Sequence, residues 1–167
     1  MEEHRLLPRE IDMLSDISDR IENTMTPEEL SRLESAKTHL SDRQSLNLKD
    51  LVIGWASHVV ELRKHTETGS GDLPYWGAHD LVAAVSLRTF TETAYTEIDD
   101  ELRTKFDPIL TEVDNEFLSF TEHDDFGCVE AVDGMSKPDR GWWWHRIPTH
   151  GPIREDIREI CQHVHHH

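Results

Sequence analysis

Segments whose apolar residues recur at intervals of three and four dominate this chain and constrain its fold more than any other feature. That spacing places the apolar side chains on one face of an α-helix. Runs that alternate β-branched and polar residues, which would indicate strands, are nearly absent. A chain of 167 residues is long enough for one compact core. The sequence therefore predicts an all-α bundle of six to seven helices, in a single helical domain over residues 1–167.

The N-terminal part is expected to form a helical hairpin over residues 5–45. Its first helix runs from Leu7 to about Asn23. Thr26 and Glu29 then fit a capping box, in which the threonine hydroxyl accepts from a helix amide and the glutamate reaches back. The polar run 41–45 ends the second helix, whose apolar stripe is Leu30, Leu33, Ala36 and Leu40.

The middle of the chain predicts two long helices. The third helix begins after Asn47, a favourable N-cap, and ends near Lys64. A loop rich in glycine, serine and threonine follows over residues 66–71 and is the best candidate for mobility. A fourth helix follows Pro74 and is apolar on nearly all sides, which predicts that it is buried.

The C-terminal half predicts shorter elements. A fifth helix opens with the acidic residues 97–101, and Asp107 with Pro108 restarts or kinks it into a sixth. Residues 122–140 carry glycines, a proline and many charges, so we expect an irregular loop or a short hairpin there. A closing helix starts at Gly151 and Pro152.

Trp142, Trp143 and Trp144 stand side by side and are three of the five tryptophans in the chain. In an extended segment the first and third would share one face, which Arg146 continues, while Trp143 would point the other way. We expect the Trp142 and Trp144 pair to be buried and Trp143 to be comparatively exposed, with this irregular segment packed across the bundle. A helical segment would instead fan the three rings about 100° apart.

The chain is strongly acidic, with 34 acidic residues against 17 basic ones and a formal charge of −17. Such a charge disfavours nucleic acid, anionic membranes and acidic substrates, and it favours a basic protein partner. Acidity for solubility alone is the alternative.

Much of this charge lies in one stretch, since fourteen acids and two bases fall between residues 92 and 133. The functional interpretation is an acidic surface that docks a basic protein, and the alternative is a solvated helix face. Together with the outward face of the tryptophan segment, the predicted partner-binding residues are Glu97, Asp100, Glu101, Glu112, Glu116, Asp124, Asp125, Trp143 and Arg146.

A metal site in the bundle is a second hypothesis. His58, Glu61 and His65 fall on one side of a predicted helix and His79 begins the next, although exposed helix residues explain this pattern as well. The chain has no phosphate-binding glycine loop, no nucleophile elbow, and no cysteine in the local context of a nucleophile. We therefore expect no metal, no cofactor and no catalytic residues.

The cysteines and the chain ends bear on the compartment. Cys128 and Cys161 lie far apart in sequence, so reduced thiols in the cytoplasm are expected. No apolar run follows the N-terminus, and eighteen apolar residues nowhere stand together, which predicts a soluble cytoplasmic protein without signal peptide or membrane span. Residues 163–167 are interpreted as containing a truncated purification tag and are excluded from any site. The oligomeric state is left open.

Four stretches between residues 48 and 150 carry a resemblance. They are Trp55, the run Tyr75-Trp76…Asp80-Leu81…Arg88, the motif Asp114-x-Glu116-Phe117, and the segment from Trp142 to Pro148. Together they resemble small, acidic, helical bacterial proteins of uncharacterised function, which implies an all-α domain and no activity. Small acidic helical proteins without catalytic motifs also look like the immunity proteins and antitoxins that neutralise bacterial toxins.

The leading hypothesis is an acidic binding protein that inhibits or sequesters a basic protein partner such as a toxin domain. An immunity protein is its sharpest form. The alternatives are a metal-dependent helical-bundle enzyme that uses His58, Glu61, His65 and His79, and a regulatory subunit without inhibitory action.

Overall fold

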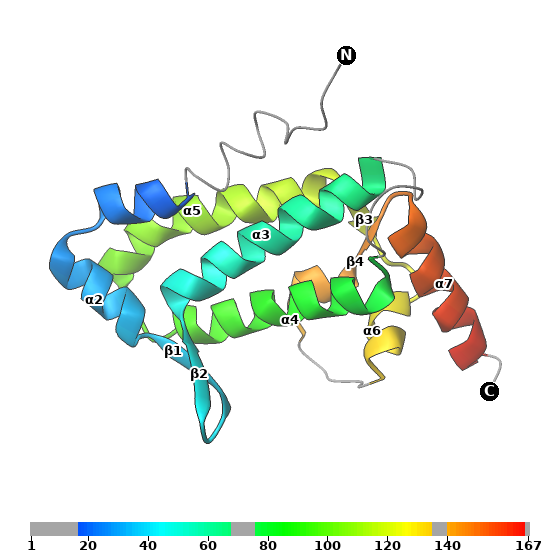
Figure 1. The fold of residues 1–167 in the computed structure, drawn as a ribbon, viewed down its shortest axis with the longest axis horizontal. Helices are drawn as coiled ribbons and strands as arrows, with labels where there is room; N and C mark the ends of the chain where they lie inside the picture. The colour runs from blue at the N-terminus through cyan, green and yellow to red at the C-terminus, as the bar shows by residue number, and fades with distance from the viewer. Residues whose placement is uncertain (1–16, 68–75, 135–139, 166–167) are drawn as a thin grey trace, which may run out of the picture.

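The computed structural model describes residues 17–67, 76–134 and 140–165, and its fold is a helical bundle (Figure 1). Helices α3 (Leu48–Glu67), α4 (Ala78–Tyr95) and α5 (Asp100–Ser119) run alongside one another along the long axis of the molecule. The predicted all-α architecture is thereby confirmed. Among the described helices, none is both long enough and apolar enough to cross a membrane.

The remaining elements gather at the two ends of this three-helix body (Figure 1). At one end lie a helical stretch over residues 17–24, helix α2 (Pro27–Ser35), and strands β1 (Lys37–Ser41) and β2 (Gln44–Asn47). At the other end lie β3 (Thr121–His123), α6 (Cys128–Asp133), β4 (Arg146–Pro148) and α7 (Pro152–His165). The 3₁₀-helix η1 (Trp142–His145) packs beside α4, where Trp143 donates to Thr89. The predicted first helix before residue 17 and most of the predicted loop over 66–71 lie outside the described residues.

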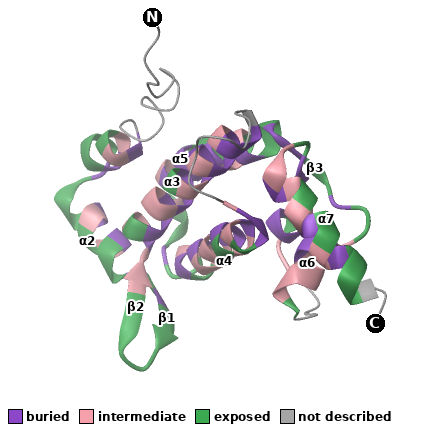
Figure 2. Cartoon of the chain, turned by 45° about the vertical axis from the view of Figure 1, so that its right-hand side comes forward, coloured by how far each residue is buried: buried purple, intermediate pink, exposed green. Residues whose placement is uncertain are grey.

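The core lies where α3, α4 and α5 turn their apolar faces toward one another (Figure 2). Trp55 of α3 is fully buried, and its ring centroid lies 5.1 Å from that of Phe117 on α5. Removing a large apolar side chain from water stabilises the folded state by roughly 1.5–3 kcal/mol. Helix α3 therefore occupies the centre of the bundle, as the width of its apolar stripe indicates.

Local capping signals in the sequence correspond to real caps. The Thr26 hydroxyl accepts from the Glu29 amide at 3.1 Å, and the Glu29 carboxylate accepts from the Thr26 amide at 2.9 Å. The Asn47 side chain accepts from the Asp50 amide at 2.9 Å at the start of α3. Each bond satisfies an amide that the first helical turn leaves without a partner.

The second helix is shorter than predicted, because residues 37–47 form a β-hairpin. Its strands pair antiparallel with Thr38 opposite Leu46. The Thr38 hydroxyl donates to the carbonyl of Phe90 on α4 at 2.6 Å, and this long-range bond holds the hairpin against the bundle. Leu40, expected on the apolar stripe of a helix, is instead exposed.

The predicted fifth and sixth helices are one continuous helix, α5, which passes through Pro108. Proline has no amide to donate to the carbonyl four residues earlier, here that of Thr104. Both residues are exposed, so solvent reaches the group that loses its bond. Buried apolar residues on either side, Phe106 and Ile109, hold the helix in the core.

The tryptophan segment is a turn of 3₁₀-helix, so the prediction of an extended strand is wrong. Trp143 and Trp144 are each 5% exposed, whereas Trp142 is 38% exposed, which corrects the predicted pairing of faces. A 3₁₀-helix has three residues per turn and therefore fans successive side chains apart. A Cβ atom on Gly141 would lie 2.2 Å from the Trp143 ring, so the turn needs glycine there.

Cys128 and Cys161 form a disulfide, and the expectation of reduced thiols is wrong for this structure. The bond ties the short helix α6 to α7 with a Cα–Cα distance of 5.1 Å. The two cysteines are 33 residues apart, so their spacing in the sequence gives no hint of this pairing.

Reduction of this disulfide should lower the free energy of unfolding by about 3–4 kcal/mol, because the bond restricts a 33-residue loop in the unfolded chain. The measurement is denaturant unfolding with and without a phosphine reductant. A variant with Cys128→Ala and Cys161→Ala is the control, and the reductant should leave its stability unchanged. Equal stability of the wild type in both conditions would show that the bond contributes nothing.

Candidate partner-binding surfaces

The N-terminal end of α5 gathers acidic side chains at the surface, including Glu97, Asp100 and Glu101. Asp99 is the N-cap, and its carboxylate accepts from the Leu102 amide at 2.9 Å. That backbone hydrogen bond holds the pKa of Asp99 below its usual value. Acidic groups also stabilise a helix N-terminus through its partial positive charge. Some of these acidic residues therefore stabilise the N-terminus of α5 rather than await a partner.

The two basic residues of α5 are already paired within the chain. Arg103 contacts Asp100 at 3.1 Å and donates to the Thr96 carbonyl at 3.0 Å. Lys105 donates to Glu29 at 2.8 Å, and this bond lowers the pKa of Glu29. The outward surface thus stays acidic, and we call it the α5 acidic face, defined by Glu97, Asp100, Glu101, Asp107 and Glu112.

Two acids of this face, Asp107 and Glu112, have partners within the chain, as does Glu116 nearby. The Tyr95 hydroxyl donates to Asp107, and burial raises the pKa of Tyr95 to about 12. Glu112 pairs with Arg20 from the N-terminal helical stretch. Glu116 pairs with Arg63, whose side chain is almost completely buried, so Glu116 acts as a counter-ion inside the bundle rather than as part of the exposed face.

Asp124 and Asp125 lie in the turn between β3 and α6 and have different roles. The Asp124 carboxylate is buried and accepts from the Val129 amide at 2.8 Å. Its own amide donates to the His145 carbonyl at 2.8 Å. The Asp125 side chain is 79% exposed, and its carboxylate lies 2.8 Å from Nδ1 of His123. Only Asp125 of the two is available to a partner.

The predicted binding residues do not form one surface. Glu97 and Glu101 lie where α5 begins, while Asp124 and Asp125 lie beyond its C-terminal end (Figure 1). A helix of 20 residues is about 30 Å long. The acidic stretch of the sequence is therefore divided between the two ends of the molecule.

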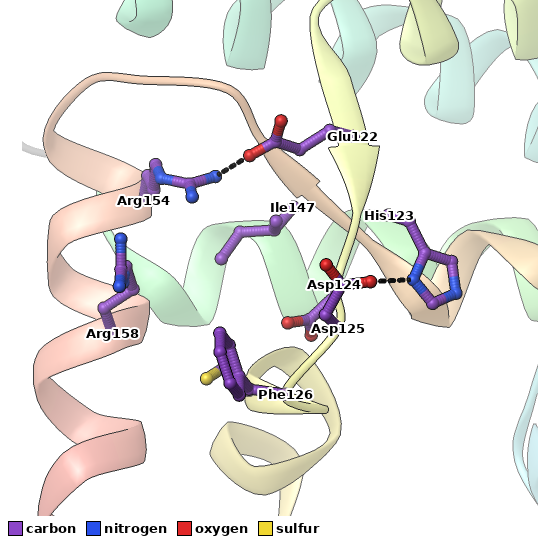
Figure 3. Close-up of a pocket in the computed structure, with 9 residues that line it drawn as sticks. Glu122, His123, Asp124, Asp125, Phe126, Ile147, Arg154 and Arg158 are labelled. Carbon is purple, nitrogen blue, oxygen red and sulfur yellow. Dashed lines mark hydrogen bonds and ion pairs between the residues drawn. The ribbon is translucent and has the colours of Figure 1, made fainter.

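A cavity of about 280 Å³ opens beside the β3–α6 turn (Figure 3). Arg154 and Arg158 of α7 line one side, the aspartates of the turn line the other, and Ile147 lies between them. Arg154 pairs with Glu122 at 2.7 Å and donates to the Pro148 carbonyl at 2.7 Å. Within the described part of the chain, Arg158 has no ion-pair partner.

Trp143 and Arg146 were predicted to contact a partner, and the structure gives both an internal role. Trp143 is buried, as described above. Arg146 is half-buried and donates to the hydroxyl and the carbonyl of Thr121, at 3.1 and 2.5 Å. Desolvation by burial lowers the pKa of Arg146. This arginine holds β4 against the first residue of β3.

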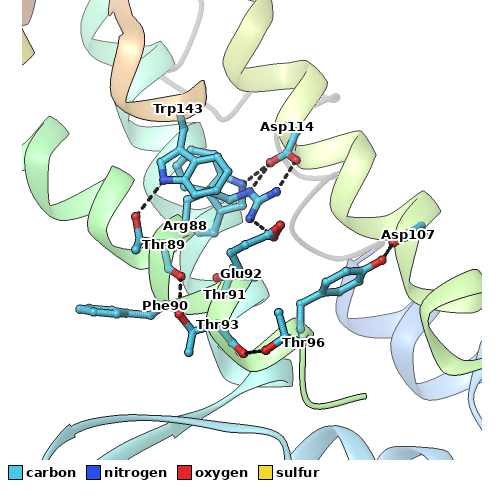
Figure 4. Close-up of polar contacts among 12 residues, drawn as sticks. Arg88, Thr89, Phe90, Thr91, Glu92, Thr93, Thr96, Asp107, Asp114 and Trp143 are labelled. Atoms are coloured by element: carbon cyan, nitrogen blue, oxygen red, sulfur yellow. Dashed lines mark hydrogen bonds and ion pairs between the residues drawn. The ribbon is translucent and has the colours of Figure 1, made fainter. Parts of the chain in front are cut away.

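A polar network in the core joins α3, α4, α5 and η1 (Figure 4). Arg88 contacts both carboxylate oxygens of Asp114, at 2.9 and 3.0 Å. The Trp55 indole donates to the same carboxylate at 2.9 Å. The Arg88 guanidinium also lies 4.3 Å from the centroid of Trp143, a cation–π contact. The side chains of Arg88 and Asp114 are only 5% and 14% exposed, so this network is a structural centre rather than an open site.

Sequence reasoning counted Asp114 among the surface acids and missed this network, although a signal was present. Asp114 follows Leu110 by four residues and precedes Phe117 by three, which places it on the apolar stripe of the helix. Arg88 likewise follows the buried Ala84 by four. A charged residue within an apolar stripe predicts a buried ion pair when a second helix offers the opposite charge.

The alternative metal site gains no geometric support. His58 Nδ1 lies 3.0 Å from the Gly54 carbonyl, and Glu61 pairs with Lys64. His65 is stacked on Trp76 with a centroid distance of 5.4 Å, and burial lowers its pKa. Across residues 17–67, 76–134 and 140–165, no group of three or more His, Cys, Asp or Glu side chains could hold a metal ion.

Comparisons of the chain with protein-family models, with curated proteins and with solved structures give no match. The resemblance to small acidic bacterial proteins stays a prediction, and function has to be argued from the residues themselves.

Proposed function

We propose that this chain is an acidic binding protein that captures and inhibits a basic protein partner, most specifically an immunity protein or antitoxin. The observation that carries the proposal is the α5 acidic face, on which the bases of α5 are already paired within the chain. Clustered exposed charge of one sign accelerates encounter with an oppositely charged protein.

Two glutamates of this face are best suited to contact a partner. Glu97 and Glu101 are exposed, and within the described part of the chain neither forms an ion pair. Their charge is therefore not neutralised locally. Asp100 beside them is almost fully exposed even though it pairs with Arg103.

The disulfide bears on where the protein acts. Disulfides persist in oxidising compartments, whereas cytosolic thiol systems keep most protein thiols reduced. The Cys128–Cys161 bond therefore favours an oxidising compartment over the cytoplasm expected from the sequence.

The test uses the product of the gene adjacent to this one as the probe and measures association by stopped-flow fluorescence. A Glu97→Lys/Glu101→Lys variant should associate at least about tenfold more slowly at low salt, and its rate should depend less on salt. The matched control is Glu155→Lys/Glu159→Lys, which changes two exposed glutamates of the same spacing on α7. No complex with the adjacent product, or equal rates for both variants, would contradict the proposal.

A further inference from the structure

Phe126 is the most exposed large apolar side chain among the described residues, with 74% of its surface in solvent. It lies in the β3–α6 turn at the rim of the cavity beside α7 (Figure 3). An exposed aromatic ring costs free energy in water unless a partner covers it. The ring therefore offers apolar surface that a partner at the cavity would bury.

Contacts on both sides of Phe126 hold the backbone of its turn in place. Asp124 on one side is buried and bonded through both its amide and its carboxylate. Gly127 on the other side has φ 64°, a left-handed conformation that favours glycine. Cys128 then anchors the chain to α7 through the disulfide. A backbone that is already held in place loses little conformational entropy on binding, which favours affinity.

The charges around Phe126 form a self-complementary pattern. Asp125 and Arg158 lie on opposite sides of the cavity, and both are exposed (Figure 3). Three acids and two arginines line this cavity, so its surroundings are nearly neutral, unlike the α5 acidic face. In a two-fold dimer, any contact between two different residues occurs twice, once in each direction.

We infer that this surface binds a second copy of the chain. In the two-fold dimer, Phe126 of each protomer enters the cavity of the other, and Asp125 of each pairs with Arg158 of the other. Two copies of charge −17 repel each other, but at physiological salt charges farther apart than the Debye length of about 8 Å are largely screened. The charges within the contact region, which is nearly neutral, therefore determine whether the two copies associate.

Sedimentation velocity over a concentration series of the full chain tests this inference. The wild type should be a dimer at high concentration, and Phe126→Ala should raise the dimer dissociation constant at least about tenfold. Leu40→Ala is the control, because it truncates another exposed apolar side chain at the opposite end of the molecule. A wild type that stays monomeric, or a dimer that survives Phe126→Ala, would overturn the inference.

Charge reversal provides the second arm. Asp125→Arg and Arg158→Asp alone should each weaken the dimer, because each places like charges opposite one another, and the double variant should restore it. Glu34→Arg on α2 makes a charge change equal to that of Asp125→Arg at the far end and should leave the dimer intact. A double variant no better than either single variant would also overturn the inference. Neither arm involves the basic partner, so the two proposals succeed or fail independently.

Discussion

Replacing Asp114 by alanine is expected to lower the free energy of unfolding by about 3–5 kcal/mol, the usual cost of removing one partner from a buried ion pair. The substitution leaves the Arg88 guanidinium, which is 5% exposed, without its bidentate acceptor. It also removes the acceptor of the Trp55 indole in the centre of the bundle. The measurement is equilibrium unfolding in guanidinium chloride.

Glu92→Ala is the matched control, because Glu92 binds the same arginine from a half-exposed position. Exposed ion pairs contribute about 0–1 kcal/mol, so this variant should remain close to the wild type. Arg88→Met combined with Asp114→Leu should recover much of the lost stability, since no buried charge then remains unpaired. If Asp114→Ala lowers the free energy of unfolding no more than Glu92→Ala does, the expectation is contradicted. Solvent would then reach the network, and its burial would not explain its contribution to stability.

Elements that depend on local interactions could be predicted from the sequence. The capping box at Thr26, the cap at Asn47 and the helix after Gly151 are set by residues within one turn of one another. The apolar residues at helical spacing around Trp55 likewise predict that α3 is buried, as the structure shows. These features need no knowledge of the rest of the fold.

Elements that depend on contacts between residues far apart in the chain could not be predicted from the sequence. The β-hairpin after α2 is held by a bond from Thr38 to Phe90, 52 residues away. Pro108 normally signals a helix boundary, but packing on both sides of it outweighs the loss of one hydrogen bond. The pairing of Cys128 with Cys161 exists only because α6 and α7 pack together.

The candidate surfaces show the same division. The sequence shows where the acidic residues lie along the chain, but it could not tell that Glu116 faces a buried arginine while Glu101 faces solvent. Phe126 was not singled out at all, because one phenylalanine among charged residues has no periodic pattern. Its role as a candidate contact follows from its exposure in a turn whose neighbouring residues are anchored to the fold.

Trp143→Ala is expected to lower the free energy of unfolding by about 3–5 kcal/mol, the range for truncating a buried tryptophan. The ring is 5% exposed, lies against the Arg88 guanidinium and donates from its indole to the Thr89 hydroxyl at 2.9 Å. Trp142→Ala is the matched control, because that ring is 38% exposed. Its truncation should lower the free energy of unfolding by only about 1–2 kcal/mol.

The comparison of these two variants decides between two geometries of the tryptophan segment. In an extended strand Trp143 would face away from its neighbours, and its truncation would cost less than that of Trp142. In the 3₁₀ turn the order is reversed, since the turn directs Trp143 into the bundle and leaves Trp142 at its edge. Denaturant unfolding of both variants gives the order directly. A larger loss for Trp142→Ala would contradict the turn, and with it the fit of Gly141 beneath the Trp143 ring.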